Sequence, residues 1–316
     1  MRFSSAPETR SIAIIGMAAL FPQARSLQEY WQNIIEQRDC ITDVPSTHWD
    51  VDDYYDADPN APDKTYSKRG GFLPTVEFDP LQFGLPPATL EVTDTSQLLG
   101  LLVARQLLED AGYGPDRDFD RSRTAVVLGV TGPQKLSNPL NSRLQYPTWK
   151  RVLRASGLDE SSIERIITRL QNSYVGWNED AMPGMLGNVI AGRIANRLNL
   201  GGMNCVVDAA CASSLGAVKV AISELLEHRC DMIITGGVDT DASIFQYVSF
   251  SKTPAFTPGS HPRPFDQEAD GMLPGEGIGM LLLKRLADAE RDGDRIYAVI
   301  RGIGASSDGR HTSIYA

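Results

Sequence analysis

The stretch Val206-Val-Asp-Ala-Ala-Cys-Ala-Ser-Ser-Leu-Gly216 decides the fold expected of this chain. The apolar run Cys205–Val207 is typical of a short buried strand, and it ends at Asp208. Small residues then turn the chain, and apolar side chains follow at helical spacing: Leu215, Val218, Ala221, Ile222 and Leu225. This order predicts a strand, a tight turn and a helix, with Cys211 at the start of the helix.

The predicted position of Cys211 favours a nucleophilic thiol. A helix N-terminus presents unpaired N–H groups and the positive end of the macrodipole, and both stabilise a thiolate. The small residues around Cys211 leave room for a substrate, and its own N–H is a candidate oxyanion donor. A free cysteine is otherwise often a buried structural residue, which is the role we expect of Cys40, Cys205 and Cys230.

Apolar runs of strand length alternate with helical segments along the chain. Six such runs are Ile12–Ile15, Ala125–Leu128, Cys205–Val207, Met232–Ile234, Ile278–Leu283 and Ile296–Ile300. Runs that are apolar on both faces suit the central strands of a parallel or mixed sheet. The alternation of strands with helices therefore predicts an α/β fold.

Capping signals mark several helix ends. Ser26 with Glu29, and Ser161 with Glu164, have the spacing of a capping box, which predicts that a helix begins after each serine. An apolar helical segment that includes Leu98 and Leu108 stops at Gly112, a suitable C′ residue.

The composition limits the classes of protein to which the chain can belong. Its 316 residues include 30 basic and 40 acidic side chains, for a net charge of −10, which argues against a nucleic-acid partner. Ile12–Phe21 is the best candidate for a signal peptide, but it falls short of the roughly 18 apolar residues that a membrane span needs. Glu8 also lies where a signal peptide would be basic, so we expect a buried strand and no membrane span.

Cysteine and acidic residues give no sign of a disulfide framework or a metal site. Four cysteines without a CxxC pair favour free thiols and a cytoplasmic location. Asp56, Asp58 and Asn60 alternate as in an EF-hand, but Ala61 and Ser67 occupy the positions that need Gly and Glu. We therefore expect no metal site.

A basic segment interrupts this acidic chain. Arg121–Leu158 contains no Asp or Glu, and its cations include Arg143, Lys150, Arg151 and Arg154. A solvated face is the simpler interpretation. The alternative is a docking surface for an acidic or phosphate-bearing partner, whose encounter a positive field would steer.

Several motifs together resemble the β-ketoacyl synthases, the condensing enzymes of fatty acid and polyketide assembly. Asp208-Ala-Ala-Cys-Ala-Ser-Ser214 resembles their active-site signature, and the resemblance covers about residues 10 to 315. The other matching segments are Ile12–Met17, Leu108–Gly112, Asn188–Asn196, Arg263-Pro-Phe-Asp266, Asp270-Gly271 and Gly275–Gly279. The sequences of Gly202–Cys211 and Phe250–Pro254 are most similar to those of ketosynthases from iterative polyunsaturated-fatty-acid and glycolipid-type polyketide synthases.

The resemblance implies a thiolase-like layered αβαβα fold that pairs as a homodimer. Its N-terminal half would be complete in this chain and its C-terminal half only begun. Residues 1–10 would form an N-terminal tail, residues 11–292 the N-terminal half, and residues 293–316 the start of the C-terminal half.

The resemblance also implies the chemistry. Cys211 would accept an acyl chain from a phosphopantetheine thioester, and decarboxylation of malonyl on an acyl carrier protein would give the carbanion that attacks it. The domain itself would bind no cofactor. Phe250 matches a position that lines the acyl pocket, although a core phenylalanine is nearly as good an interpretation. Asp270 and Glu276 match acidic positions near the catalytic centre, where anchoring the loop by hydrogen bonds is favoured over proton transfer.

Two histidine motifs of the family are missing from this chain. One resembles HGTGT and the other KSxxGH, and their histidines stabilise the enolate that develops on decarboxylation. On sequence grounds, none of the four histidines present replaces them: His48, His228, His261 and His311.

Two explanations account for these missing motifs. Either the chain is the N-terminal part of a longer condensing enzyme, or it is a degenerate non-catalytic protein that binds an acyl carrier protein or a condensing subunit. We favour the first because the nucleophile is intact and the last strand would be an unpaired fragment of the second half. A thiolase that uses free coenzyme A thioesters is disfavoured by the Arg263-to-Gly279 motifs.

Overall fold

The centre of the protein is a six-stranded mixed sheet. The structure is a computed structural model that describes residues 10–115, 117–132, 134–307 and 309–310. The strand order is β5-β4-β6-β7-β1-β8. The strands are β1 (Ile12–Leu20), β4 (Thr124–Gly129), β5 (Asn204–Val207), β6 (Met232–Asp239), β7 (Gly277–Arg285) and β8 (Ala298–Ile300). All six predicted strands are therefore confirmed, but the expectation that the last one is unpaired is wrong, because β8 pairs antiparallel with β1.

Strand directions bring four strand ends to one edge of the sheet. β4 pairs in parallel with both β5 and β6, whereas β7 is antiparallel to β6 and to β1. The carboxyl ends of β1, β4, β5 and β6 therefore lie together with the start of β7. Loops that follow these strands can approach one another, as at the binding edge of other α/β sheets.

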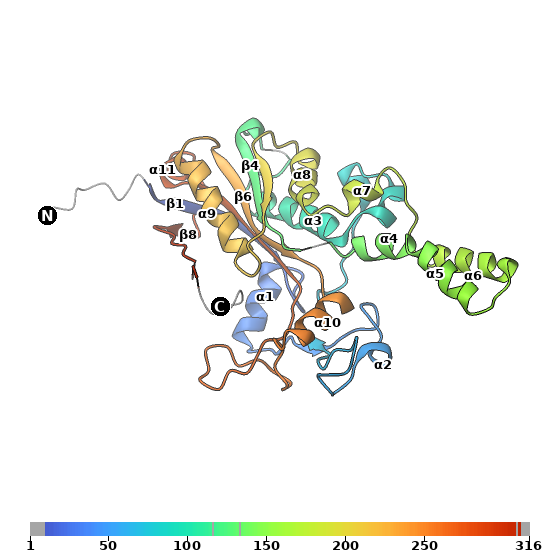
Figure 1. The fold of residues 1–316 in the computed structure, drawn as a ribbon. Coiled ribbons are helices and arrows are strands. Elements are labelled where there is room, and N and C mark those ends of the chain that lie inside the picture. The colour runs from blue at the N-terminus through green and yellow to red at the C-terminus, as the bar shows by residue number, and fades with distance from the viewer. Residues whose placement is uncertain (1–9, 116, 133, 308, 311–316) are drawn as a thin grey trace.

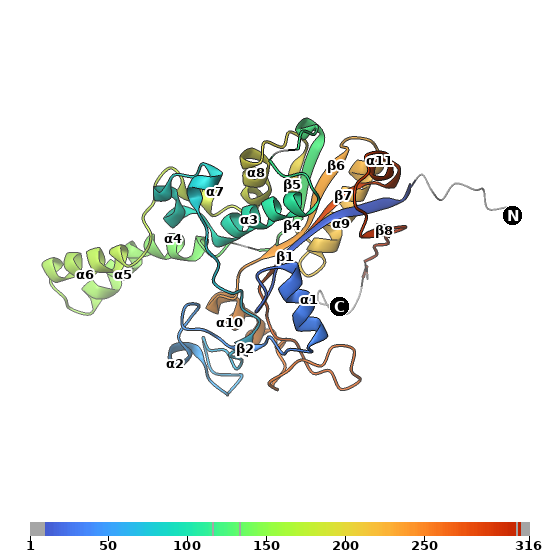
Figure 2. The same cartoon turned by 180° about the vertical axis from the view of Figure 1, so that it is seen from behind.

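Helices cover both faces of the sheet (Figures 1 and 2). The main helices are α1 (Leu27–Ile35), α3 (Thr95–Asp110), α4 (Ser137–Arg143), α5 (Tyr146–Ala155), α6 (Glu160–Asn172), α8 (Asn188–Arg197), α9 (Ser213–Leu226), α10 (Ile244–Lys252) and α11 (Leu286–Arg291). The shorter elements are α2 (Val51–Tyr54), α7 (Ala181–Gly184), η2 (Pro80–Phe83), η3 (Pro87–Val92), η4 (Arg121–Arg123) and a small sheet of β2 (Thr42–Asp43) and β3 (Arg69–Gly70).

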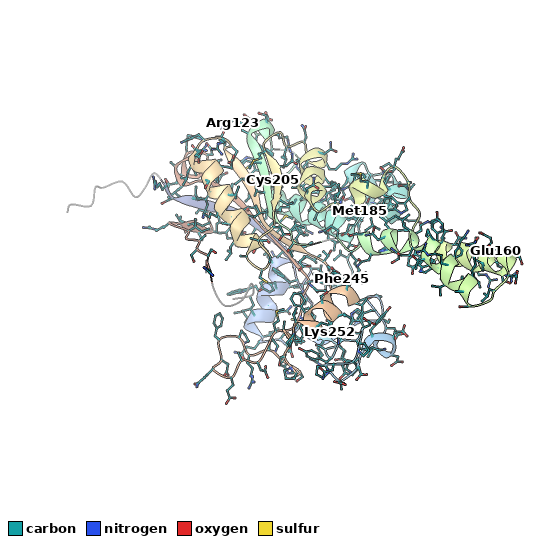
Figure 3. The ribbon with its side chains drawn as sticks, viewed as in Figure 1. Arg123, Glu160, Met185, Cys205, Phe245 and Lys252 are labelled. Atoms are coloured by element: carbon teal, nitrogen blue, oxygen red, sulfur yellow. The ribbon has the colours of Figure 1, made fainter. Side chains whose placement is uncertain are left out.

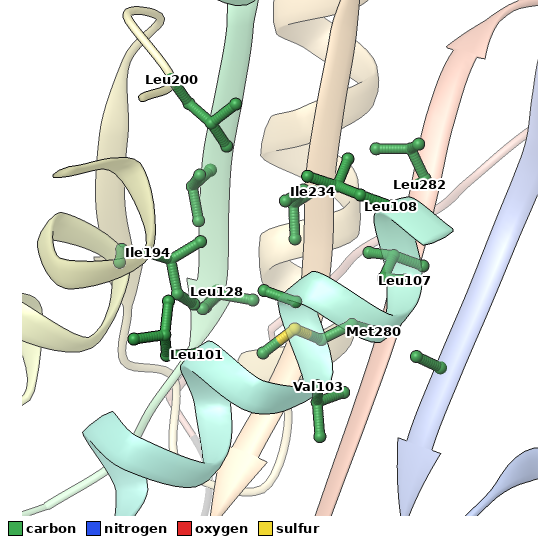
Figure 4. Packing of buried hydrophobic residues seen from close by; sticks show 14 of the residues in the cluster. Leu101, Val103, Leu107, Leu108, Leu128, Ile194, Leu200, Ile234, Met280 and Leu282 are labelled. Atoms are coloured by element: carbon green, nitrogen blue, oxygen red, sulfur yellow. The ribbon is translucent and has the colours of Figure 1, made fainter. Parts of the chain in front are cut away.

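Alternate residues of β4 enter two different cores. Val126 and Leu128 are fully buried in the core formed with α3 and α8 (Figure 4). Ala125 and Val127 are buried in the core beneath α9 on the opposite face. Each large apolar side chain removed from water contributes about 1.5–3 kcal/mol, so both faces stabilise the sheet. This pattern confirms the interpretation of the apolar runs as strands buried on two sides.

Two of the predicted helix ends are confirmed. The Oγ of Ser26 accepts the N–H of Glu29 at 3.2 Å and caps α1, while the carboxylate of Glu29 binds the N–H of Arg25 instead of closing a capping box. α3 is followed by Gly112 at φ +75°, a left-handed conformation that glycine adopts without strain.

The predicted cap at Ser161 is wrong. α6 begins earlier, and Asp159 caps it by accepting the N–H of Ser162 at 3.0 Å. An ionised carboxylate interacts better than a hydroxyl with the positive end of the helix, which explains why Asp159 prevails.

The apolar run near the N-terminus forms β1, inside the sheet, as expected of a buried strand. In the part of the chain that the structure describes, none of the helices combines the length and the apolar character that crossing a membrane requires.

Candidate active site

Cys211 lies in the turn between β5 and α9, at the edge where the parallel strands end. The turn runs from Asp208 to Ala212, and Ala212 is the N-cap of α9. The predicted order of strand, turn and helix is confirmed, although Cys211 precedes the helix rather than occupying its first position. Cys211 is exposed, so its thiol is accessible to a substrate.

Asp208 ties this turn to the loop after β4. Its Oδ1 accepts the hydroxyl of Thr131 at 2.8 Å and the N–H of Ala210 at 3.0 Å, and its Oδ2 accepts the N–H of Gly132 at 3.2 Å. These hydrogen bonds, first of all the one from Ala210, lower the pKa of Asp208. The carboxylate therefore acts as a fixed, ionised bracket for the turn.

The hydroxyl of Ser213 also stabilises the turn. Its Oγ accepts the N–H of Ala209 at 2.8 Å and donates to the carbonyl of Ala210 at 2.6 Å. Ala210 has a φ of +49°, a left-handed conformation that costs roughly 1 kcal/mol for a residue with a Cβ. These two hydrogen bonds of the Ser213 hydroxyl, one accepted and one donated, help to hold this strained residue beside Cys211.

The first turn of α9 sits directly on the ends of β4 and β6. A Cβ placed on Gly129 would lie 2.4 Å from the backbone N of Ser214, and one placed on Gly237 would lie 2.9 Å from the Cβ of Ser214. Only glycine at Gly129 permits this approach, because the atoms it meets are backbone atoms. The sheet thus fixes the position of the turn that carries Cys211.

The polar groups around Cys211 suit a nucleophile. Among the described residues, the N–H of Cys211 donates to no acceptor. The next two N–H groups are already engaged, because Ala212 and Ser213 donate to the carbonyls of Ala209 and Ala210 at 3.1 and 3.0 Å. An oxygen that gains negative charge next to the sulfur would therefore meet the N–H of Cys211 itself as a hydrogen-bond donor.

The other three cysteines are less suited to nucleophilic chemistry. Burial raises the pKa of Cys230 to about 11, and it also raises the pKa of Cys205 and of Cys40. Cys230 is buried as predicted, but Cys40 and Cys205 are only half-buried. Cys205 lies on β5, an edge strand, which explains its partial exposure (Figure 3).

Glu276 joins two loops at the same edge of the sheet, just before β7. It is buried, its Oε1 lies 3.1 Å from Nε2 of His48, and its Oε2 accepts the N–H of Leu73 at 2.9 Å. His48 and Glu276 are far apart in the sequence and carry no local signal of this contact. Sequence reasoning therefore missed His48 as the partner of Glu276.

In the part of the chain that the structure describes, the side chain of Asp270 forms its hydrogen bonds within its own loop. Its carboxylate accepts the hydroxyl of Thr257 at 2.7 Å and a guanidinium N–H of Arg263 at 3.1 Å. The hydrogen bond from Thr257, followed by the charge of Arg263, lowers the pKa of Asp270. Asp270 and Glu276 thus both make hydrogen bonds that anchor loops. A role of either carboxylate in proton transfer stays a prediction.

Phe250 lies on α10 in a separate aromatic cluster. Its ring centroid is 5.8 Å from that of Phe256, and the cluster also contains Trp49, Phe72 and Tyr247. The predicted role of Phe250 in lining an acyl pocket stays a prediction.

Two of the four histidines lie beside carboxylates, a third follows a helix end, and the fourth lies outside the described residues. Nε2 of His261 lies 2.8 Å from the carboxylate of Asp39, and His48 pairs with Glu276. His228 follows the end of α9 at φ +55°. His311 lies outside the described residues.

The basic segment Arg121–Leu158 runs from η4 through β4 and α4 to α5, and α5 projects from the protein as a hairpin with α6 (Figure 1; Figure 3 labels Glu160 on α6). Lys150 pairs with Glu164, and Arg154 binds Glu160 through two hydrogen bonds of 2.5 and 2.9 Å. Arg143 donates to the carbonyl of Tyr174 at 3.0 Å, and Arg151 to the hydroxyl of Thr148 at 3.0 Å. Lys150 and Arg154 are thus paired with acidic residues that α6 brings from outside the acid-free segment, whereas Arg143 and Arg151 bond only neutral oxygens.

Fold and site define the class of protein. Residues 9–289 match the family model described as the N-terminal domain of β-ketoacyl synthase, and the chain belongs to that family. The layered α/β fold is that of the thiolase-like ketosynthases.

Individual relatives are large synthases and their ketosynthase domains. The chain is 47% identical over 304 residues to a polyunsaturated fatty acid synthase polypeptide of Thraustochytrium sp., covering 96% of this chain and 11% of that protein. It is 35% identical to polyketide synthase PksL of Bacillus subtilis, covering 97% of this chain and 6% of that protein. The chain therefore spans a small part of the curated relatives.

Solved ketosynthases have the same fold. The ketosynthase from module 6 of the bacillaene synthase of Bacillus subtilis 168 superposes with a TM-score of 0.76 at 32% identity, over 97% of this chain and 46% of that chain. The PfaC keto synthase-chain length factor superposes with a TM-score of 0.78 at 31% identity, over 92% of this chain and 31% of that chain.

Proposed function

We propose that Cys211 is the acyl-accepting nucleophile of a β-ketoacyl synthase domain. The observation that carries this proposal is an exposed thiol in a braced turn at the start of α9, with a free N–H of its own among the described residues. The thiolate would attack the carbonyl carbon of an acyl thioester, and collapse of the tetrahedral adduct would release the carrier thiol. The N–H of Cys211 would donate to the oxyanion in that adduct.

Carbon–carbon bond formation would follow in a second step. Malonyl on a carrier protein would lose carbon dioxide, and the resulting carbanion would attack the acyl group on Cys211. The β-ketoacyl product would leave on the carrier, and the thiolate would be regenerated. This step needs groups that stabilise the enolate, and we assign them to the two histidine motifs that this chain lacks.

The substrates would arrive on the phosphopantetheine arm of an acyl carrier protein in the cytoplasm, with no cofactor bound by the domain itself. We expect a homodimer as well. β5 is an edge strand, and an edge with unpaired backbone groups tends to be covered or extended in a stable protein.

The test of the nucleophile is labelling with an acyl-mimicking electrophile. Cys211→Ala should abolish labelling, whereas Cys40→Ala should leave it unchanged. Equal loss of labelling in both variants would show that Cys211 is not the nucleophile. The chain alone should accept acyl groups weakly or not at all and should make no β-ketoacyl product from malonyl and acyl thioesters. Product formation would contradict the assignment of essential chemistry to the absent histidines.

Carrier docking on the α5–α6 hairpin has its own test. Replacing Arg151 and Arg154 by Glu reverses two charges on α5, and binding of an acidic carrier protein at low salt should weaken about tenfold. Arg25→Glu, an exposed position outside the hairpin, is the control and should have no effect. Unchanged binding by the double variant would exclude the hairpin as the docking surface.

A further inference from the structure

Three buried polar side chains near the start of α3 take no part in the chemistry proposed above. Asp94, Ser96 and Gln134 are 3, 2 and 8% exposed, and we call them the α3 polar group. A buried polar side chain costs free energy unless it finds hydrogen-bond partners, and a satisfied network of such groups fixes one local geometry. The partners of the α3 polar group therefore show which part of the molecule it holds in place.

The two carboxylate oxygens of Asp94 have different partners. Oδ1 accepts the N–H of Ser96 at 2.9 Å and thereby caps α3. Oδ2 accepts the N–H of Leu136 at 2.8 Å. Leu136 leads directly into α4, which lies near one end of α3 in both views (Figures 1 and 2). The cap needs only the first contact, so the second holds a segment from another part of the sequence.

Ser96 and Gln134 extend the contact to a second point of that segment. The hydroxyl of Ser96 lies 2.7 Å from Oδ1 of Asp94 and 2.8 Å from Oε1 of Gln134, so its one hydrogen is shared between two acceptors. Nε2 of Gln134 donates to the carbonyl of Gly132 at 3.4 Å. A series of hydrogen bonds therefore runs from Asp94 to Gly132.

Gly132 is the point at which this series reaches the Cys211 turn. Its N–H donates to Oδ2 of Asp208 at 3.2 Å, and Oδ1 of Asp208 accepts the N–H of Ala210, the neighbour of Cys211. A Cβ placed on Gly132 would lie within 4 Å of none of the described atoms, so packing does not hold this residue. Its hydrogen bonds therefore hold it.

We propose that Asp94 is a positioning residue for the reactive thiol and acts through residues 132–136. Its carboxylate holds one end of this segment directly, and the rest of the α3 polar group holds the other end. The N–H of Gly132 thereby stays aimed at Asp208, which braces the Cys211 turn. Among the described residues, Asp94 itself forms no hydrogen bond with the turn. The inference rests on the proposed function, because it concerns the reactivity of Cys211 as a nucleophile.

Asp94→Ser separates the two contacts of the carboxylate. Serine caps a helix about as well as aspartate, but its single oxygen cannot also accept the N–H of Leu136. Acylation of Cys211 by an activated acyl ester should slow about tenfold, because the tetrahedral oxyanion depends on where the N–H of Cys211 lies. Alkylation by iodoacetamide forms no oxyanion, and its rate should stay within about a factor of two. A merely structural role would change both rates together.

Asp159→Ser is the matched control, because Asp159 caps α6 in the same way but lies in the hairpin. It should change neither rate. Gln134→Leu removes the side-chain hydrogen bonds of Gln134 and keeps its approximate size, so it should slow acylation alone by about fivefold. Gln134→Leu decides the question by the same criteria if Asp94→Ser does not fold. Unchanged acylation in Asp94→Ser, or equal slowing with both reagents, would overturn the proposal.

Failure of the proposed function would give a different result. If Cys211 were not the nucleophile, the ester would acylate Cys211→Ala as fast as the unsubstituted chain. If only the positioning role were wrong, Cys211→Ala would lose acylation and Asp94→Ser would keep it.

Discussion

The Cys211 turn is held by the ends of several strands, whereas the α5–α6 hairpin is held by the side chains of its own two helices. At the turn, Gly129 lets α9 rest on β4, and Asp208 binds the loop beyond β4. In the hairpin, Ile163 and Ile167 of α6 are buried, and Arg154 of α5 binds Glu160 of α6. The contacts of the first region run through the sheet and those of the second are local. We therefore expect substitutions in the turn to change the reactivity of Cys211, and substitutions in the hairpin to leave that reactivity unchanged.

Gly129→Ala should have the largest effect. The new Cβ would lie 2.4 Å from backbone atoms of α9, so the free energy of unfolding should fall by roughly 3 kcal/mol and labelling of Cys211 should slow. Urea denaturation and the labelling rate measure the two effects. Gly157→Ala, at φ +85° beside α5 with open space around it, is the control and should cost about 1 kcal/mol without slowing the labelling. Similar results for both variants would mean that the close approach on β4 does not govern the turn.

Ile163→Ala tests whether packing inside the hairpin influences Cys211. Removing a fully buried side chain should destabilise the hairpin by about 2 kcal/mol, seen as faster amide exchange in α5 and α6. Labelling of Cys211 should stay within a factor of two of the unsubstituted chain. A large loss of labelling would show that the two regions are coupled.

Asp239 gives the turn-bearing edge a pH dependence opposite in sign to that of the hairpin, where hydrogen bonds from Ser161 and Arg154 lower the pKa of Asp159 and Glu160. Burial, reinforced by the nearby carboxylates of Asp241 and Glu276, raises the pKa of Asp239 to about 6. The folded state then holds the proton more tightly than the unfolded state does, so this group lowers stability as the pH rises from about 4 to 6.

Asp239→Asn removes that titration and keeps an oxygen for the N–H of Asp241, which Oδ1 of Asp239 accepts at 3.0 Å. The variant should match the unsubstituted chain near pH 4 and exceed its stability by about 2 kcal/mol at pH 7. Denaturation at a series of pH values gives this difference directly. A constant difference across the series would rule out titration of Asp239 as its source.

The strands and the Cys211 turn also differ from the rest of the molecule in how far the sequence predicts them. They were predictable because they depend on residues close together in the sequence, from Val206 to Gly216 in the case of the turn. Gly112 was predictable as a helix end for the same reason.

The contacts that were missed join distant segments. Glu276 pairs with His48, and Lys150 and Arg154 of α5 pair with acids that only the folding of α6 brings near. The cap of α6 was misplaced because Asp159 and Ser161 are both good capping residues, and sequence spacing did not decide between them. Likewise, the apolar spacing of α1 predicts a helix, but it does not predict that Trp31, Ile34 and Ile35 point outward.

Alkylation rates at all four cysteines give the sharpest test of Cys211 as the reactive thiol of this chain. Mass spectrometry of one sample, quenched at intervals after addition of a small electrophile, follows every site at once. Cys211 should react first, Cys40 and Cys205 more slowly, and Cys230 last, because burial raises the pKa of the other three thiols. A rate at Cys40 or Cys205 equal to or above that at Cys211 would show that Cys211 is not the reactive thiol.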